Sequence, residues 1–173
     1  MGCSVSKGVV TGRASLRLWP QTPKPRFLYV VVEDEQAIQD DLKKMIVASD
    51  PSITKDMVHG FVDTDRLVAS INELGEEHNA SHPEATRFIV FMDMRLRNSH
   101  GIDAVKLLTP AAHQVRSPVA CIAATAFHQP RDCATYKETG CVSVLCKPYD
   151  ETLVKRVIHH VKTTPMVFQV FTS

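Results

Sequence analysis

The chain of 173 residues lacks several features that would assign it to other classes of protein. It has five cysteines, an odd number, and no two of them have the Cys-x-x-Cys spacing. They therefore do not indicate a disulfide framework. No signal-peptide core precedes them, and we therefore expect reduced thiols in an intracellular protein. No apolar run reaches the length of a transmembrane helix. A net charge of +1 gives no reason to expect a nucleic-acid partner.

Acidic residues are absent before Glu33, whereas that stretch contains five basic ones, Lys7, Arg13, Arg17, Lys24 and Arg26. Residues 1–26 also show no sustained hydrophobic periodicity and are rich in Gly, Ser and Pro, so we expect a flexible basic arm. The chain is 44% hydrophobic and 23% charged, which is ordinary for a globular protein with a real core. We therefore predict one domain over residues 27–163 and a short tail over 164–173.

Short apolar runs and amphipathic segments alternate five times within that domain. The apolar runs predict strands over 27–32, 57–62, 88–92, 119–124 and 142–145. Helical spacing predicts helices over 35–48, from 63 or 64 through Leu74, and over 102–108, 132–138 and 151–161. Residues 75–86 are expected to form a polar loop, and the tail receives no assignment. Because each crossover helix must pack back onto the sheet, we predict an α/β fold in which helices cover both faces of a five-stranded parallel sheet.

Polar residues follow four of these strands. They are Glu33, Asp34 and Glu35 after the first, Asp93 after the third, Thr125 after the fourth and Lys147 after the fifth. Functional groups in parallel sheets gather at the carboxyl ends of the strands, so we expect these residues to share one edge. Carboxylates there suit Mg²⁺, and an aspartate can attack phosphorus. A hydroxyl and a lysine can stabilise the transferred group, so the set predicts metal-assisted phosphoryl transfer.

The chain from about Phe27 to Thr163 resembles the receiver domain of two-component response regulators, which has flavodoxin-like topology. The resemblance rests on LYVVVEDE, FIVFMDM, Gly101, CIAATA and VLCKP in this order. It implies that Asp93 accepts phosphate from a histidine kinase or a histidine phosphotransfer protein, and that Thr125 and Lys147 contact the phosphoryl group. It also implies that Mg²⁺ is held by Glu33, Asp34, Asp93 and the backbone carbonyl of Arg95. Such a protein is a phosphoacceptor switch rather than an enzyme with a separate substrate.

Three residues depart from the receiver pattern. Arg97 stands where a proline is usual, four residues past Asp93. Arg95 brings a basic side chain beside the phosphate, so we expect an altered rate of dephosphorylation. Val144 replaces an aromatic residue whose movement couples to the hydroxyl residue in many receivers. We expect partners to bind around the last two helices and the fifth strand.

These departures leave two hypotheses of different class. The first is a stand-alone phospho-receiver, since only about ten residues follow the domain. The second is a receiver-like binding or scaffold module that is not phosphorylated, and Val144 favours it. A phosphatase with an aspartyl nucleophile is a third and more distant hypothesis, because it would need a second acid at the position of Arg95.

The segment MGCSVSK at the start of the arm matches an acylation pattern. Gly2 with Ser6 predicts N-myristoylation, and Cys3 predicts palmitoylation. One acyl chain binds membranes only marginally, whereas two chains or added basic residues give stable attachment. We therefore predict anchoring to the cytoplasmic face of a membrane. The alternatives are an organelle transit peptide and a plain disordered extension.

Overall fold

The computed structural model describes residues 26–81, 86–109, 114–165 and 167–172. One sheet contains the strands β1 (Arg26–Val32), β2 (Val58–Phe61), β3 (Thr86–Asp93), β4 (Val119–Thr125), β5 (Cys141–Cys146) and β6 (Gln169–Phe171). The strand order is β2-β1-β3-β4-β5-β6, and every neighbouring pair is parallel. The predicted α/β fold is thus confirmed. The predicted count of five strands is wrong, because the tail adds a sixth.

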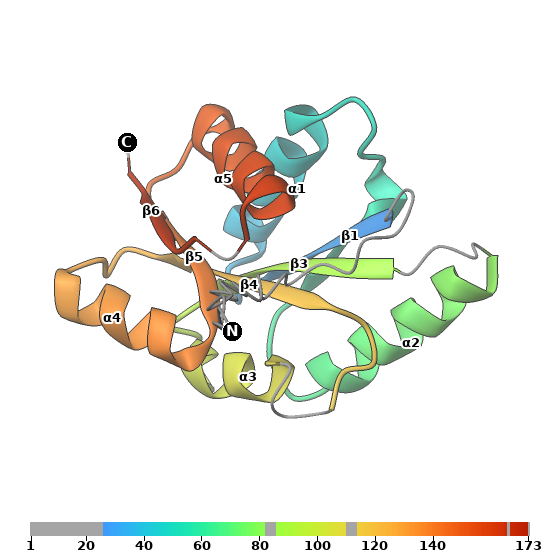
Figure 1. Ribbon diagram of the computed structural model, residues 1–173, viewed down its shortest axis with the longest axis horizontal. Coiled ribbons are helices and arrows are strands. Elements are labelled where there is room, and N and C mark those ends of the chain that lie inside the picture. Colours follow the sequence, from blue (N-terminus) through green and yellow to red (C-terminus); the bar gives the residue numbers. More distant parts are fainter. Residues whose placement is uncertain (1–25, 82–85, 110–113, 166, 173) are drawn as a thin grey trace, which may run out of the picture.

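Helices cover both faces of this sheet (Figure 1). They are α1 (Gln36–Ser49), α2 (Leu67–Ser81), α3 (Gly101–Leu108), α4 (Pro130–Thr139) and α5 (Glu151–Thr163), with a short 3₁₀ turn, η1 (Lys55–Met57), before β2. Helices α1 and α5 lie on one face, and α2, α3 and α4 lie on the other (Figure 1). Among the helices of the described residues, none has both the length and the apolar character needed to cross a membrane.

The inner strands are buried on both faces, which explains their unbroken apolar runs. Every residue of β3 and β4 is buried. Helix α5 shows the complementary pattern, with one buried stripe that includes Leu153, Val157 and Val161. Its start is fixed by Asp150, whose side chain accepts a hydrogen bond from the Leu153 backbone N–H at 2.8 Å. These local patterns set the parallel order that brings the strand ends together.

Helix α2 is longer than the sequence pattern predicts. Residues 75–81, expected to be loop, continue the helix to Ser81. Gly75 is buried in it, and a side chain there would press against Ser117 and Phe88. Glu76 on its outer side forms an ion pair with Arg116. The outward positions are polar, so this part of the helix lacks the apolar repeat by which it could have been recognised.

Strand β6 is held by contacts from both neighbouring elements. The Ser143 hydroxyl donates to the carbonyl of Gln169 at 2.8 Å, and the ring Nε2 of His160 lies 2.6 Å from the carbonyl of Val167. Phe171 is only 3% exposed, and its ring centroid lies 5.5 Å from that of His160. The tail therefore completes the core under α5. A strand of three residues is too short to show a period in the sequence.

Candidate functional site

Three carboxylates meet at the carboxyl edge of the sheet. Asp93 ends β3 and is 8% exposed, whereas Glu33 follows β1 and is 3% exposed. Asp34 is half-buried beside them, and one oxygen from each of the three groups lies within 4.8 Å of the others. Gly101 lets the start of α3 pack against the end of β3, because a Cβ there would clash with the Asp93 carbonyl oxygen. The predicted meeting of the β1 and β3 acids occurs in the structure.

Lys147 bridges two of these acids. Its Nζ donates to Glu33 Oε2 at 2.6 Å and to Asp93 Oδ2 at 2.8 Å. Burial lowers the pKa of Lys147, but its hydrogen bonds to Asp93 and Glu33 outweigh burial and raise the pKa above the ordinary value. Burial raises the pKa of Glu33, and the hydrogen bond from Lys147 opposes that rise. The ammonium group is therefore held charged between two carboxylates.

The third acid pairs with a residue for which the sequence suggested no role. The backbone N–H and the side-chain Nε of Arg97 each lie 3.1 Å from Asp34 Oδ2. The residue that replaces the usual proline thus brings a positive charge to the acid cluster. Arg95 donates its backbone N–H to Asp93 Oδ1 at 2.9 Å, which fixes the loop beside the acid. The role of the Arg95 carbonyl as a metal ligand stays a prediction.

The donor set fits Mg²⁺. Mg²⁺ prefers carboxylate oxygens and retains several waters, and the only groups of metal-ligating type gathered here, among the described residues, are the carboxylates of Glu33, Asp34 and Asp93. Asp34 is accessible, since 15% of its side chain is exposed and its ion-pair partner Arg97 is itself 73% exposed. Release of the Arg97 side chain would leave Asp34 Oδ2 able to face a cation.

Thr125 ends β4 and is 1% exposed. Its hydroxyl oxygen accepts a hydrogen bond from the Phe127 backbone N–H at 3.1 Å. Burial raises the pKa of Tyr136, a buried residue of α4, and an interaction with the Thr125 side chain opposes that rise. The Thr125 hydroxyl is therefore tied both to the loop that follows β4 and to α4.

An arginine covers that loop. The Cζ atom of Arg95 lies 3.6 Å from the centroid of the Phe127 ring, a cation–π contact between the loops after β3 and β4. A cavity of about 400 Å³ has Arg95, Phe127 and Tyr136 on its wall. Val144 is fully buried in β5. The aromatic side chain that contacts Thr125 thus comes from α4, and its position in a short helix without clear pattern gave no signal in the sequence.

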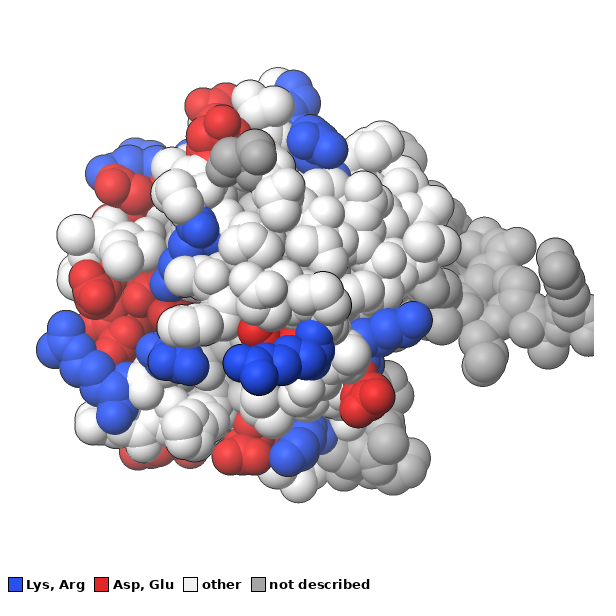
Figure 2. Space-filling model, turned by 90° about the vertical axis from the view of Figure 1, so that its left-hand side faces the viewer, with Lys and Arg blue, Asp and Glu red and all other residues white. Residues whose placement is uncertain are grey.

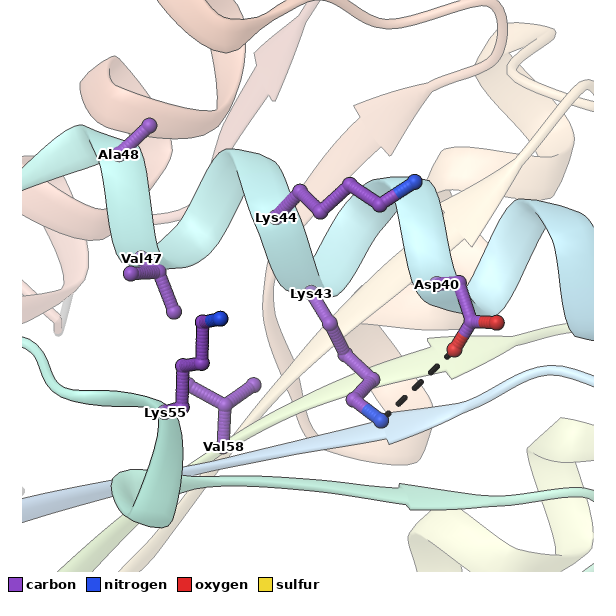
Figure 3. A pocket seen from close by; sticks show the side chains of 7 residues that line it. All are labelled: Asp40, Lys43, Lys44, Val47, Ala48, Lys55 and Val58. Carbon is purple, nitrogen blue, oxygen red and sulfur yellow. Dashed lines mark ion pairs between the residues drawn. The ribbon is translucent and has the colours of Figure 1, made fainter.

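A second cavity, of about 510 Å³, lies elsewhere, between α1 and the η1–β2 segment (Figure 3). It is lined by Asp40, Lys43, Lys44, Val47, Ala48, Lys55 and Val58. Lys43 lies 3.8 Å from Asp40, and Lys44 lies 2.9 Å from Asp41. None of the strand-end residues lines this cavity, so it takes no part in the chemistry of the acid cluster.

Comparison with known proteins agrees with this arrangement. No protein-family model matches the sequence, and no curated protein is significantly similar to it. Solved structures do match. The chemotaxis protein CheY4 of Vibrio cholerae matches with a TM-score of 0.58 and 15% identity, over 79% of this chain and 98% of that one. The chain has the receiver fold.

Two further receiver structures share this fold. The receiver domain of Ssk1 from Saccharomyces cerevisiae, solved with the histidine phosphotransfer protein Ypd1, matches with a TM-score of 0.55 and 19% identity, over 79% of this chain and 88% of that one. A CheY-like receiver from Methanospirillum hungatei matches with a TM-score of 0.57 and 15% identity, over 82% of this chain and 94% of that one. Each of these three structures is thus matched over most of its own length.

The bridge made by Lys147 predicts a pH-dependent effect of Lys147→Met. We expect the free energy of unfolding to fall by about 2 kcal/mol at pH 7, since two partly buried acids lose their shared cation. The pKa of Glu33 then rises further above its unfolded value, so the folded state holds more protons than the unfolded state. Stability therefore decreases as the pH rises, and the loss should vanish below about pH 4.

Urea unfolding of the wild type and the variant between about pH 3 and pH 8 measures this effect. Lys44→Met is the matched control, because Lys44 forms an ion pair of 2.9 Å with Asp41 on the exposed side of α1. We expect no measurable loss from the control at any pH. A loss for Lys147→Met that does not change with pH would contradict the electrostatic explanation.

Proposed function

We propose that this protein is a phosphoacceptor switch of a two-component signalling system. The observation that supports this best is the contact of Lys147 with both Asp93 and Glu33 inside the acid cluster. A buried aspartate flanked by two further acids and a lysine suits a group that gains and loses a phosphoryl group. The receiver fold of the neighbours supports the same function.

In the proposed reaction, a carboxylate oxygen of Asp93 forms a bond to the phosphorus of a phosphohistidine. The bond between phosphorus and the imidazole nitrogen breaks, and its electron pair stays on the imidazole. Lys147 then holds an oxygen of the new acyl phosphate by a charge-assisted hydrogen bond. The reaction modifies the protein's own aspartate, so the phosphotransfer is self-catalysed and no separate substrate is turned over.

Mg²⁺ would be held by Glu33, Asp34 and Asp93, together with the backbone carbonyl of Arg95. When bound, it supplies positive charge against the phosphoryl oxygens. Arg97 would exchange its contact with Asp34 for water. The carboxylate donor set of the cluster supports this assignment.

A histidine kinase or a histidine phosphotransfer protein is the phosphate donor that we propose. Support comes from the Ssk1 receiver, which was solved together with such a phosphotransfer protein. That receiver covers 79% of this chain with the same fold. The output partner would recognise the change at Thr125, Phe127 and α4 rather than a movement of Val144.

Phosphorylation of Asp93 can be tested directly by intact-mass measurement. We expect incubation with acetyl phosphate and Mg²⁺ to add one phosphoryl group. The addition should need Mg²⁺ and should disappear in Asp93→Asn. Asp103→Asn, which changes an exposed acid at the start of α3, is the matched control and should still be modified.

The alternative function is a receiver-like binding or scaffold module that is never phosphorylated. Val144 in place of an aromatic residue is the observation that favours it. Absence of any modification, together with absence of Mg²⁺ binding in calorimetry, would support this module and would leave Asp93 as a structural residue.

The interaction of the Tyr136 hydroxyl with Thr125 predicts the behaviour of Tyr136→Phe. Thr125 must leave its present partners before its hydroxyl can reach a phosphoryl group on Asp93. Removing the Tyr136 hydroxyl removes one of these partners, worth about 1 kcal/mol. We therefore expect beryllofluoride, a phosphoryl mimic, to bind about fivefold more tightly in the presence of Mg²⁺.

Isothermal titration calorimetry measures this affinity. Thr125→Val is the comparison, since it removes the hydroxyl itself and should weaken binding. Unchanged or weaker binding by Tyr136→Phe would mean that the bond to α4 does not oppose the movement of Thr125.

The acylation pattern at Gly2 and Cys3 lies outside the described residues, and anchoring to a membrane is likewise a proposal. We expect protein from a eukaryotic host to carry a myristoyl group on Gly2, and Gly2→Ala to lose it and leave the membrane fraction. Intact mass and fractionation check this. An unmodified Gly2 would refute the anchor, and a chain shortened at its N-terminus would favour the transit peptide.

A further inference from the structure

Strand β6 forms one edge of the sheet and has no charged side chain of its own. Among the strands of the described residues it is the outermost on the β5 side, and residues 163–173 contain no charged side chain. Proteins usually protect such edges with charged residues, prolines or bulges, and here the shortness of the strand is the main protection. Figure 2 views the molecule from the side on which α4 and β6 lie. A broad area without Lys, Arg, Asp or Glu occupies the middle and right of that view, with charged side chains above it, below it and to its left.

The register of the sheet shows which backbone groups of β6 point outward. The Lys147 N–H donates to the Thr125 carbonyl, so backbone groups two and four residues earlier in β5 also face β4. Val144 lies between Ser143 and Leu145, so its backbone N–H and C=O groups face β6 instead. Val144 is opposite Val170, and in a parallel ladder it bonds to the residues on either side of its partner, Gln169 and Phe171. The N–H and C=O groups of Phe168 and Val170 are therefore directed away from the sheet.

The sequence around Gln169 is self-complementary for antiparallel pairing. It reads Val167-Phe168-Gln169-Val170-Phe171, with an aromatic and a β-branched residue exchanged across the central glutamine. Antiparallel pairing centred on Gln169 sets Phe168 opposite Val170 of a second copy, and Val170 opposite Phe168. These are the residues whose backbone groups point outward, so each such pair can exchange both hydrogen bonds. Aromatic and β-branched side chains also form favourable cross-strand pairs.

We propose that β6 is a dimer interface, in which the β6 strands of two copies of this chain pair antiparallel about Gln169 and join the two sheets. A second copy is the occupant that the pattern favours, because only an identical segment gives the same pairs on both sides of the centre. The strand itself brings no charged side chain to the contact, and the cations of Lys137 and Arg156 lie over the rings of Phe168 and Phe171 beside it. The contact is short, so we expect a weak dimer with a Kd on the order of tens of micromolar.

The proposed register makes Gln169 the decisive position. Its side chain is exposed, and it would lie opposite its own copy at a pair without hydrogen bonds, where side chains approach most closely. Gln169→Lys or Gln169→Glu sets two like charges opposite each other, which is destabilising in a sheet pair. An equimolar mixture of the two variants sets opposite charges together instead.

Sedimentation equilibrium of the full chain from about 5 to 500 μM tests the proposal. We expect a monomer–dimer equilibrium for the wild type, at least tenfold weaker association for each variant alone, and recovery in the mixture. Gln114→Lys is the matched control, since Gln114 is an exposed glutamine before β4 and the change in net charge is identical. It should dimerise like the wild type.

Amide hydrogen exchange on the same samples is the second measurement. Protection of the Phe168 and Val170 amides should increase with wild-type concentration and should not do so in either variant alone. A wild type that stays monomeric throughout would overturn the proposal. So would a dimer that survives both substitutions, or a dimer that is lost when residues 1–25 are removed although β6 is intact, because each places the contact elsewhere.

Discussion

The balance of charge at the carboxyl edge of the sheet is the constraint on which the site depends. Three carboxylates lie within reach of a single ion, and like charges at that spacing repel one another in a partly buried setting. Lys147 and Arg97 offset this repulsion from two different strand connections. The parallel order of β1, β3, β4 and β5 brings these groups together, and the packing of α1 and α5 on one face and α2 to α4 on the other keeps that order fixed.

Much of this fold can be predicted because the inner strands are buried on both sides and read as apolar runs. The two errors have a common physical reason. The second half of α2 turns polar positions outward and packs Gly75 inward, so it shows no apolar period. Strand β6 owes its place to Phe171, His160 and Ser143, and contacts with residues distant in sequence leave no local pattern.

The residues of the site also fall into a group that the sequence predicts and a group that it does not. Glu33, Asp93, Thr125 and Lys147 can be found from the sequence because a rule of parallel sheets brings the strand ends together. The roles of Arg97 and Tyr136 depend on side-chain direction, which strand order does not specify. Arg97 turns toward Asp34, and Tyr136 reaches Thr125 from a helix eleven residues further along the chain. Residues of this kind give the chain its individual properties, whereas the strand-end set is what it has in common with the receiver pattern.

The pairing of Arg97 with Asp34 has a consequence for how the two proposed ligands depend on each other. With both cations in place, the acid cluster keeps one negative charge in excess. A divalent metal that displaces Arg97 would take over its charge at Asp34, and a phosphoryl group alone would deepen the negative excess. An aspartyl phosphate bears about two negative charges at neutral pH, which the metal would offset. In the proposed switch, metal and phosphate should therefore favour each other's binding.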